Sequence, residues 1–232
     1  MGLARSAIVL CLLAICALTA HAEMINTFTL DAAGWQISGP PAYDFGVAVD
    51  AVGTDPNGQK YAVIEIDKNF RDGPDPQTGV IPPIVLNFTQ MGDGSAMRLF
   101  IDDESVANLT GVSWRGFDWV LMQNGVATFN QDLTNVGGLN GFSVAPFSQH
   151  QWIVSPGMDN QTLAASGGVV PAGSTFQPGA GPGNLVIDIQ PAGPWPMSFS
   201  LKELPIPGVS VPEPASLAMM LAGAVALWRR RK

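Results

Sequence analysis

Apolar and polar residues alternate along several stretches of this chain, and the alternation limits the possible folds more than any other feature. Phe28 and Leu30 alternate with threonine and aspartate, and Met197, Phe199 and Leu201 alternate with serine and lysine. Residues 84–89 and 185–190 show the same period. A period of two turns one strand face toward a core and the other toward solvent, which is typical of antiparallel sheets.

The strand-like runs are numerous and short. They lie near residues 26, 45, 62, 86, 99, 114, 120, 152, 187 and 199, between clusters of Gly, Pro, Asn and Asp. No part of the body keeps a helical stripe over three turns. The pattern therefore predicts an all-β fold, a β-sandwich for which the jelly roll is one candidate topology. The stretch 164–184, rich in Gly and Pro, predicts a long surface loop with one short strand around Val169.

The N-terminus has the order of a secretory signal peptide. Arg5 precedes an apolar run, and the small-residue triplet from Ala20 to Ala22 follows it. We expect an N-terminal signal helix over residues 1–22. Signal peptidase would remove it, so that the mature chain begins at Glu23.

The body that would be exported lacks thiols and is strongly acidic. Cys11 and Cys16, the two cysteines, lie in the signal peptide, so the mature chain offers no disulfide and no thiolate. All 19 acidic residues lie between Glu23 and Glu213, whereas six of the 11 cations do, which gives this part a formal charge of −13. Such a charge repels phosphate backbones, so we expect no nucleic-acid partner.

The C-terminus consists of three parts. Val211–Pro214 reads VPEP, an apolar run spans Leu217–Trp228, and four cations end the chain. The apolar run predicts a short hydrophobic helix, shorter than the roughly 20 residues that a stable membrane span needs. Cationic flanks stay on the cytoplasmic side, which would leave the body outside. The residues expected to act in the membrane and in sorting are Leu217, Leu221, Leu227, Trp228, Arg229, Arg230, Arg231 and Lys232.

These three parts, in this order and at this position, resemble the PEP-CTERM sorting signal of exported bacterial proteins. The resemblance implies that the tail is held transiently in the inner membrane. It also implies that exosortase, a membrane-embedded cysteine protease, cuts at or near Pro212, Glu213 and Pro214. The body would then pass to the cell surface or to the exopolysaccharide matrix of a biofilm. Prolines keep the motif extended and open to a protease. A permanent anchor formed by the C-terminal helix is the alternative.

The chain is thus predicted to have four parts. A signal peptide covers residues 1–22, and a single β-sandwich domain covers residues 23–203. A Pro-rich linker covers residues 204–210, and the sorting signal covers residues 211–232.

Catalytic chemistry has little support in the sequence. His150 is the only histidine left after export, no G-x-S-x-G motif occurs, and we interpret His150 as a solvated loop residue. Glu65 and Asp67 project from one face of a strand. Asp102, Asp103 and Glu104 are expected to crowd a turn. A carboxylate-dependent polysaccharide hydrolase would need two such acids facing each other across a cleft, so a noncatalytic protein is the favoured interpretation.

A calcium site is the one cofactor hypothesis. Asp67, Asn69, Asp72 and Asp75 would place carboxylate and amide oxygens in one glycine-containing loop, and Ca²⁺ prefers such oxygen ligands. The spacing departs from that of an EF-hand, and two cations lie in the same segment. We therefore favour an ordinary solvated turn and expect no cofactor.

Aromatic residues suggest carbohydrate binding. Trp195 stands between two prolines, and together with Trp35 it is a candidate platform for the flat face of a sugar. Trp114 and Trp119 have apolar neighbours and are predicted to fill the core instead.

Overall fold

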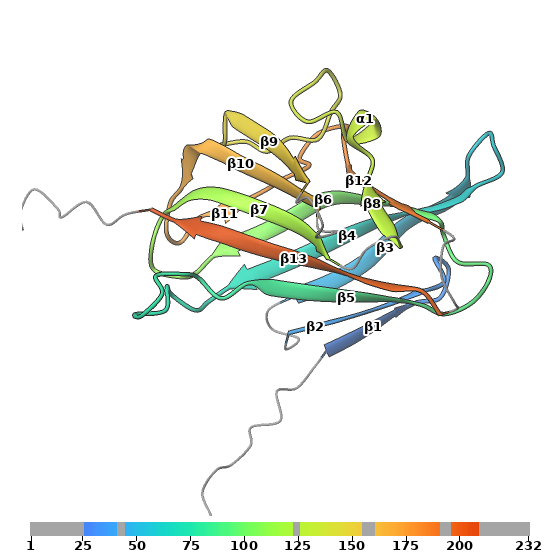
Figure 1. Ribbon diagram of the computed structural model, residues 1–232, viewed down its shortest axis with the longest axis horizontal. Coiled ribbons are helices and arrows are strands. Elements are labelled where there is room, and N and C mark those ends of the chain that lie inside the picture. Colours follow the sequence, from blue (N-terminus) through green and yellow to red (C-terminus); the bar gives the residue numbers. More distant parts are fainter. Residues whose placement is uncertain (1–25, 41–44, 123–125, 155–160, 191–195, 209–232) are drawn as a thin grey trace, which may run out of the picture.

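The part of the protein that the structure describes is a sandwich of two β-sheets with one short helix, as seen in a computed structural model (Figure 1). The structure describes residues 26–40, 45–122, 126–154, 161–190 and 196–208. Its elements are β1 (Asn26–Leu30), β2 (Trp35–Gly39), β3 (Phe45–Thr54), β4 (Lys60–Phe70), β5 (Ile84–Gln90), β6 (Arg98–Asn108), β7 (Trp114–Met122), β8 (Ala127–Phe129), α1 (Gln131–Thr134), β9 (Gln149–Val154), β10 (Gln161–Val170), β11 (Thr175–Phe176), β12 (Leu185–Ile189) and β13 (Ser198–Pro207).

The strands divide between a seven-stranded and a six-stranded sheet. Sheet A has the order β1-β2-β5-β13-β7-β10-β9, and sheet B has the order β3-β4-β6-β12-β8, with β11 pairing beside β6. All neighbours in sheet A are antiparallel, as the alternation predicts. In sheet B, β4 and β6 are parallel. Between β4 and β6 the chain passes through β5 of sheet A. When it comes back to sheet B, β6 therefore runs in the same direction as β4.

The core lies between the two sheets and is built by the predicted alternation. Ile84, Leu86 and Phe88 of β5 point inward, as do Phe199 and Leu201 of β13. Trp114 and Trp119 have no exposed surface, which confirms that they are core residues. The all-β sandwich predicted from the pattern is therefore confirmed.

Aromatic rings join the two sheets through Phe117 of β7. Its ring centroid lies 4.7 Å from that of Trp119 in sheet A. It also lies 5.9 Å from that of Phe70 and 5.4 Å from that of Phe176, both in sheet B. Edge-to-face and tilted contacts at these separations are the favoured arrangements of aromatic pairs.

A β-bulge in β6 changes which of its residues face the core. Glu65 of β4 pairs with Asp102, but Asp67 pairs with Ser105, so β6 carries one extra residue. Ile101 and Glu104, three positions apart, are consequently both buried. The predicted turn at residues 102–104 is wrong, because these residues form part of a long strand.

Two segments expected to be loop or linker are strand. β10 runs through Gln161–Val170, where Leu163 and Ala165 are buried, so the predicted loop at 164–184 starts later, after Val170. Leu204–Pro207, the first part of the predicted linker, continue β13 and pair with β7. Prolines are tolerated at these positions near the strand end, where a register shift interrupts the ladder.

We expect Phe117→Ala to lower the free energy of unfolding by about 3–5 kcal/mol, because the lost ring leaves a cavity at the contact between the sheets. Chemical denaturation measures this loss. Leu139→Ala is the control, since this side chain is 91% exposed and its loss should change stability by less than about 0.5 kcal/mol. Equal effects of the two substitutions would contradict the central role of Phe117.

Candidate functional site

The predicted processing and sorting residues lie outside the described part of the chain. They are Ala20, Ala22 and Glu23 at the N-terminus, and Pro212, Glu213, Pro214 and the residues that follow them at the C-terminus. The same holds for Trp195. In the described ranges, no helix has the length and apolar character that a membrane span requires.

Trp35 is not a platform for sugars. Its side chain has no exposed surface, and its ring lies 5.6 Å from that of Phe199, centroid to centroid. Its indole Nε1 donates a hydrogen bond to the Ala96 carbonyl oxygen at 2.9 Å. The prediction for Trp35 is therefore wrong, because β2, which the sequence did not predict, turns this residue into the core.

The four candidate calcium ligands do not share one loop. Asp67 and Asn69 belong to β4, whereas Asp72 and Asp75 are exposed in the connection after it. Asp75 closes a local turn in which its Oδ1 accepts hydrogen bonds from the backbone N–H groups of Thr78 and Gln77, and these lower the pKa of Asp75. Within the described residues, no three His, Cys, Asp or Glu side chains are grouped to hold a metal ion.

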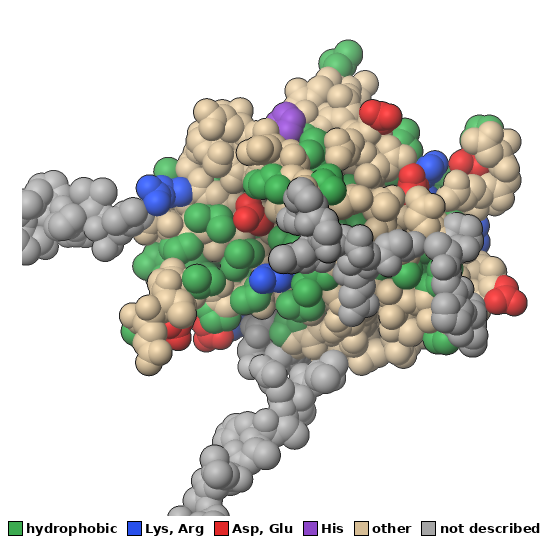
Figure 2. All heavy atoms as spheres, in the orientation of Figure 1, with side chains coloured by type: hydrophobic (Ala, Val, Ile, Leu, Met, Phe, Trp, Pro, Cys, Tyr) green, Lys and Arg blue, Asp and Glu red, His purple; other side chains and the backbone are tan. Residues whose placement is uncertain are grey.

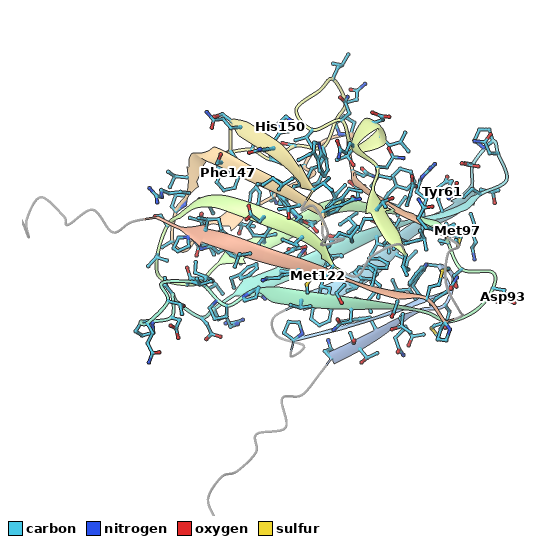
Figure 3. The ribbon with its side chains drawn as sticks, in the orientation of Figure 1. Tyr61, Asp93, Met97, Met122, Phe147 and His150 are labelled. Carbon is cyan, nitrogen blue, oxygen red and sulfur yellow. The ribbon has the colours of Figure 1, made fainter. Side chains whose placement is uncertain are left out.

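His150 lies on β9 at the edge of sheet A rather than in a loop (Figure 3). Its side chain is exposed, and Figure 2 shows a histidine at the surface of this face. Glu65 and Asp67 do lie on the same face of β4, as predicted, and that face is turned away from the core. These acids and His150 belong to different sheets.

The structure brings together three charged side chains that the sequence analysis did not group. Lys68 of β4 and Glu104 of β6 come from sheet B, and Glu203 of β13 comes from sheet A. Lys68 Nζ lies 2.7 Å from Glu104 Oε1 and 2.6 Å from Glu203 Oε1. All three side chains have 0% exposed surface. This buried ionic cluster spans the core between the sheets.

The two carboxyls in the cluster differ in their surroundings. Burial raises the pKa of Glu203, and repulsion from Glu104 raises it further, while Lys68 opposes the rise; the result is a pKa of about 8. Glu203 Oε2 has no hydrogen-bond partner among the described residues. Glu104 Oε2 instead accepts a hydrogen bond from Trp119 Nε1 at 3.3 Å.

Lys68 keeps its charge in this setting. Burial alone would lower its pKa, but the two carboxyls outweigh burial and raise the pKa of Lys68. Because the raised pKa of Glu203 favours its neutral form, one ionised carboxyl is enough to balance the ammonium of Lys68 and to bring the cluster to zero charge. A neutral total is the arrangement that limits the cost of burying ions.

The alternation of inward and outward residues along β4 and β13 indicates in the sequence that charged side chains face the core. Lys68 continues the inward series of Ile64 and Ile66, and Glu203 continues that of Phe199 and Leu201. A charge at an inward position requires a partner in the core. The partner could not be identified from the sequence, because Glu104 and Glu203 are 36 and 135 residues from Lys68.

A family model described as the PEP-CTERM protein-sorting motif matches residues 210–232. No curated protein and no solved structure matches the chain. The fold and the motif together define the class: an exported protein whose body is an all-β sandwich and whose destination is the cell surface or the extracellular space. More specifically, the chain carries a PEP-CTERM sorting signal and is a substrate of exosortase.

Removing the cation from the buried ionic cluster should be costly. We expect Lys68→Met to lower the free energy of unfolding by about 3–5 kcal/mol, because it leaves two buried acids without their partner. Adding Glu104→Leu and Glu203→Leu should regain stability relative to Lys68→Met, since no unpaired charge then remains.

Lys60→Met is the matched control, because Lys60 lies on the same strand with its Nζ donating to the Gly94 carbonyl oxygen at the surface. It should cost about 1 kcal/mol or less. Denaturant titration measures the free energy of unfolding of Lys68→Met, of the triple variant and of Lys60→Met, each against the unmodified protein. A loss for Lys68→Met no larger than that for Lys60→Met would show that the cluster does not stabilise the core.

Proposed function

We propose that the mature protein is a noncatalytic component of the cell surface or of an exopolysaccharide matrix, and that exosortase delivers it there. The observation that carries the proposal is the sorting motif at residues 210–232, joined to an acidic β-sandwich. The motif directs the protein to exosortase, and the folded body is the part that would remain at the cell surface or in the matrix. In this proposal signal peptidase first removes residues 1–22, and the tail is held only transiently in the inner membrane.

The positions of the carboxyls support a noncatalytic body. Glu104 and Glu203 approach a common partner, but both are fully buried and cannot reach a polymer. Glu65 and Asp67 lie side by side on one strand face rather than opposite each other. A glycosidase needs two carboxyls on opposite sides of a glycosidic bond, roughly 5 to 9.5 Å apart.

The charge of the body fits a polysaccharide matrix better than a nucleic acid or an anionic membrane. A formal charge of −13 between Glu23 and Glu213 repels both of the latter. Trp195, which stands between Pro194 and Pro196 in the sequence, is the residue that we propose for contact with a sugar ring. The host's own exopolysaccharide is the polymer that we propose as ligand.

Sequencing both ends of the protein recovered from producing cells tests the route. We expect an N-terminus at Glu23 and a C-terminus at or next to Pro212, Glu213 and Pro214. Replacing these three motif residues with alanine should leave Lys232 on the protein and shift the protein from the surface fraction to the inner-membrane fraction.

The control for this test replaces Pro82 and Pro83, which are exposed and lie far from the motif along the chain, with alanine. This variant should be processed like the unmodified protein. An intact Lys232 on the unmodified mature protein would overturn processing and favour the permanent anchor.

A pull-down with the host exopolysaccharide tests the ligand. We expect Trp195→Ala to reduce recovery severalfold, because an aromatic face contributes most to such contacts, whereas Trp195→Phe should keep most of it. Equal recovery of all three proteins would exclude this residue as the contact. Release of new reducing ends from the polymer would instead support the hydrolase.

A further inference from the structure

An amine and a carboxyl lie in direct contact in a part of the core that water does not reach. Lys68 Nζ is 2.6 Å from Glu203 Oε1, and neither side chain has exposed surface. The carbon that the amine would attack is one bond beyond that oxygen. Reacting atoms in productive geometries lie roughly 3 to 3.5 Å apart. The contact therefore brings the amine and the carboxyl as close together as the formation of an amide bond requires.

The backbone holds these reactants in place. Lys68 lies within the ladder between β4 and both of its neighbours, and Glu203 is paired on both sides, with Ile84 of β5 and Trp119 of β7. Side chains on paired, central strands have little freedom to separate. Holding two groups together in this way can replace a large part of the entropic barrier of a reaction.

The third member of the cluster, Glu104, has the position of a proton carrier. Glu104 Oε1 lies 2.7 Å from Lys68 Nζ, and Glu104 Oε2 accepts a hydrogen bond from Trp119 Nε1. Burial and repulsion from Glu104 raise the pKa of Glu203 and favour its neutral form, which is more electrophilic than a carboxylate. One acid is suited to accept protons and the other to be attacked.

We propose that Lys68 and Glu203 condense without any other protein into an amide bond between Lys68 Nζ and Glu203 Cδ, with Glu104 carrying the protons. The product is a covalent cross-link between sheet B and sheet A.

The reaction balances with one water as its by-product. Glu104 takes a proton from the Lys68 ammonium, and the nitrogen lone pair then forms the N–C bond at Glu203. Glu104 returns this proton to the Glu203 hydroxyl, which leaves as water as its C–O bond breaks. The nitrogen gives its second proton to Glu104, which ends protonated. Total charge is zero before and after, and no atom is oxidised or reduced.

Condensation also removes the unfavourable feature of the cluster. An amide and a neutral acid take the place of two full charges in the core, on Lys68 and Glu104. The product therefore no longer bears the desolvation cost of buried ions. The bond would close a loop between residues 135 positions apart in a chain whose mature part has no cysteine. It would attach β13, the last strand before the sorting signal, to the opposite sheet.

Tryptic digestion and tandem mass spectrometry of the protein recovered from producing cells test the cross-link. Trypsin cuts after Lys60 and Arg71 but not after an acylated Lys68. We therefore expect the peptide Tyr61–Arg71 joined to the peptide that carries Glu203, with the mass of one water missing. Glu104 lies in a different tryptic peptide, Leu99–Arg115, so the digest distinguishes the two acids.

Two results would overturn the proposal. One is a free peptide ending at Lys68 with no joined species, and the other is a join to the peptide that contains Glu104. The assignment does not depend on the destination of the protein, so it stands or fails independently of export and processing.

The variant Glu104→Gln tests the proton carrier, because it keeps the size of the side chain but removes its basic oxygen. We expect condensation to slow by about 10²-fold or more, the usual contribution of a positioned acid–base group. The control Asp67→Asn changes an exposed carboxyl on β4 and should leave the cross-link complete. Circular dichroism shows whether each variant is folded. A fully cross-linked, folded Glu104→Gln protein would remove Glu104 from the reaction.

Discussion

The burial of one face of each sheet against the other is the constraint on which the structure depends. The described residues include no cysteine and only one short helix, so the contact between the sheets has to hold the fold together. Aromatic rings provide much of this contact, with Phe117 of sheet A meeting Phe70 and Phe176 of sheet B. Burial of large rings supplies a strong driving force per residue, together with preferred geometries that favour one arrangement of the sheets.

The buried ionic cluster is the exception within this apolar interface. Lys68, Glu104 and Glu203 lie at inward positions that the alternation would otherwise give to apolar side chains. Ion pairs in a core are weak evidence for stability, because desolvation offsets the attraction between the charges. A cluster that spans two sheets therefore invites a chemical explanation, and contact between an amine and a neutral acid provides one.

The sorting motif and the folded β-sandwich are separate parts of this protein. The sorting motif at residues 210–232 directs the chain to exosortase, while the sandwich lies N-terminal to it. Their connection is short, because β13 extends to Pro207 and pairs with β7 up to its last residue. The folded body therefore ends only a few residues before the motif, and the strand nearest to the motif lies in the middle of sheet A.

The fold class, most of the longer strands and the sorting signal could be predicted from the amino-acid sequence alone. A period of two and a motif of contiguous residues are both local patterns, readable without knowing what lies nearby in space. The sequence pattern missed most of β10, where Gly, Ser and Ala hide the alternation, and the two- and three-residue strands β11 and β8. It also missed β2, which alternates over only five residues, and so misplaced Trp35. Only the tertiary structure decided that Lys68 meets Glu104 and Glu203. Sheet order, the parallel pairing of β4 with β6 and a one-residue bulge create that contact, and none of these leaves a local trace in the sequence.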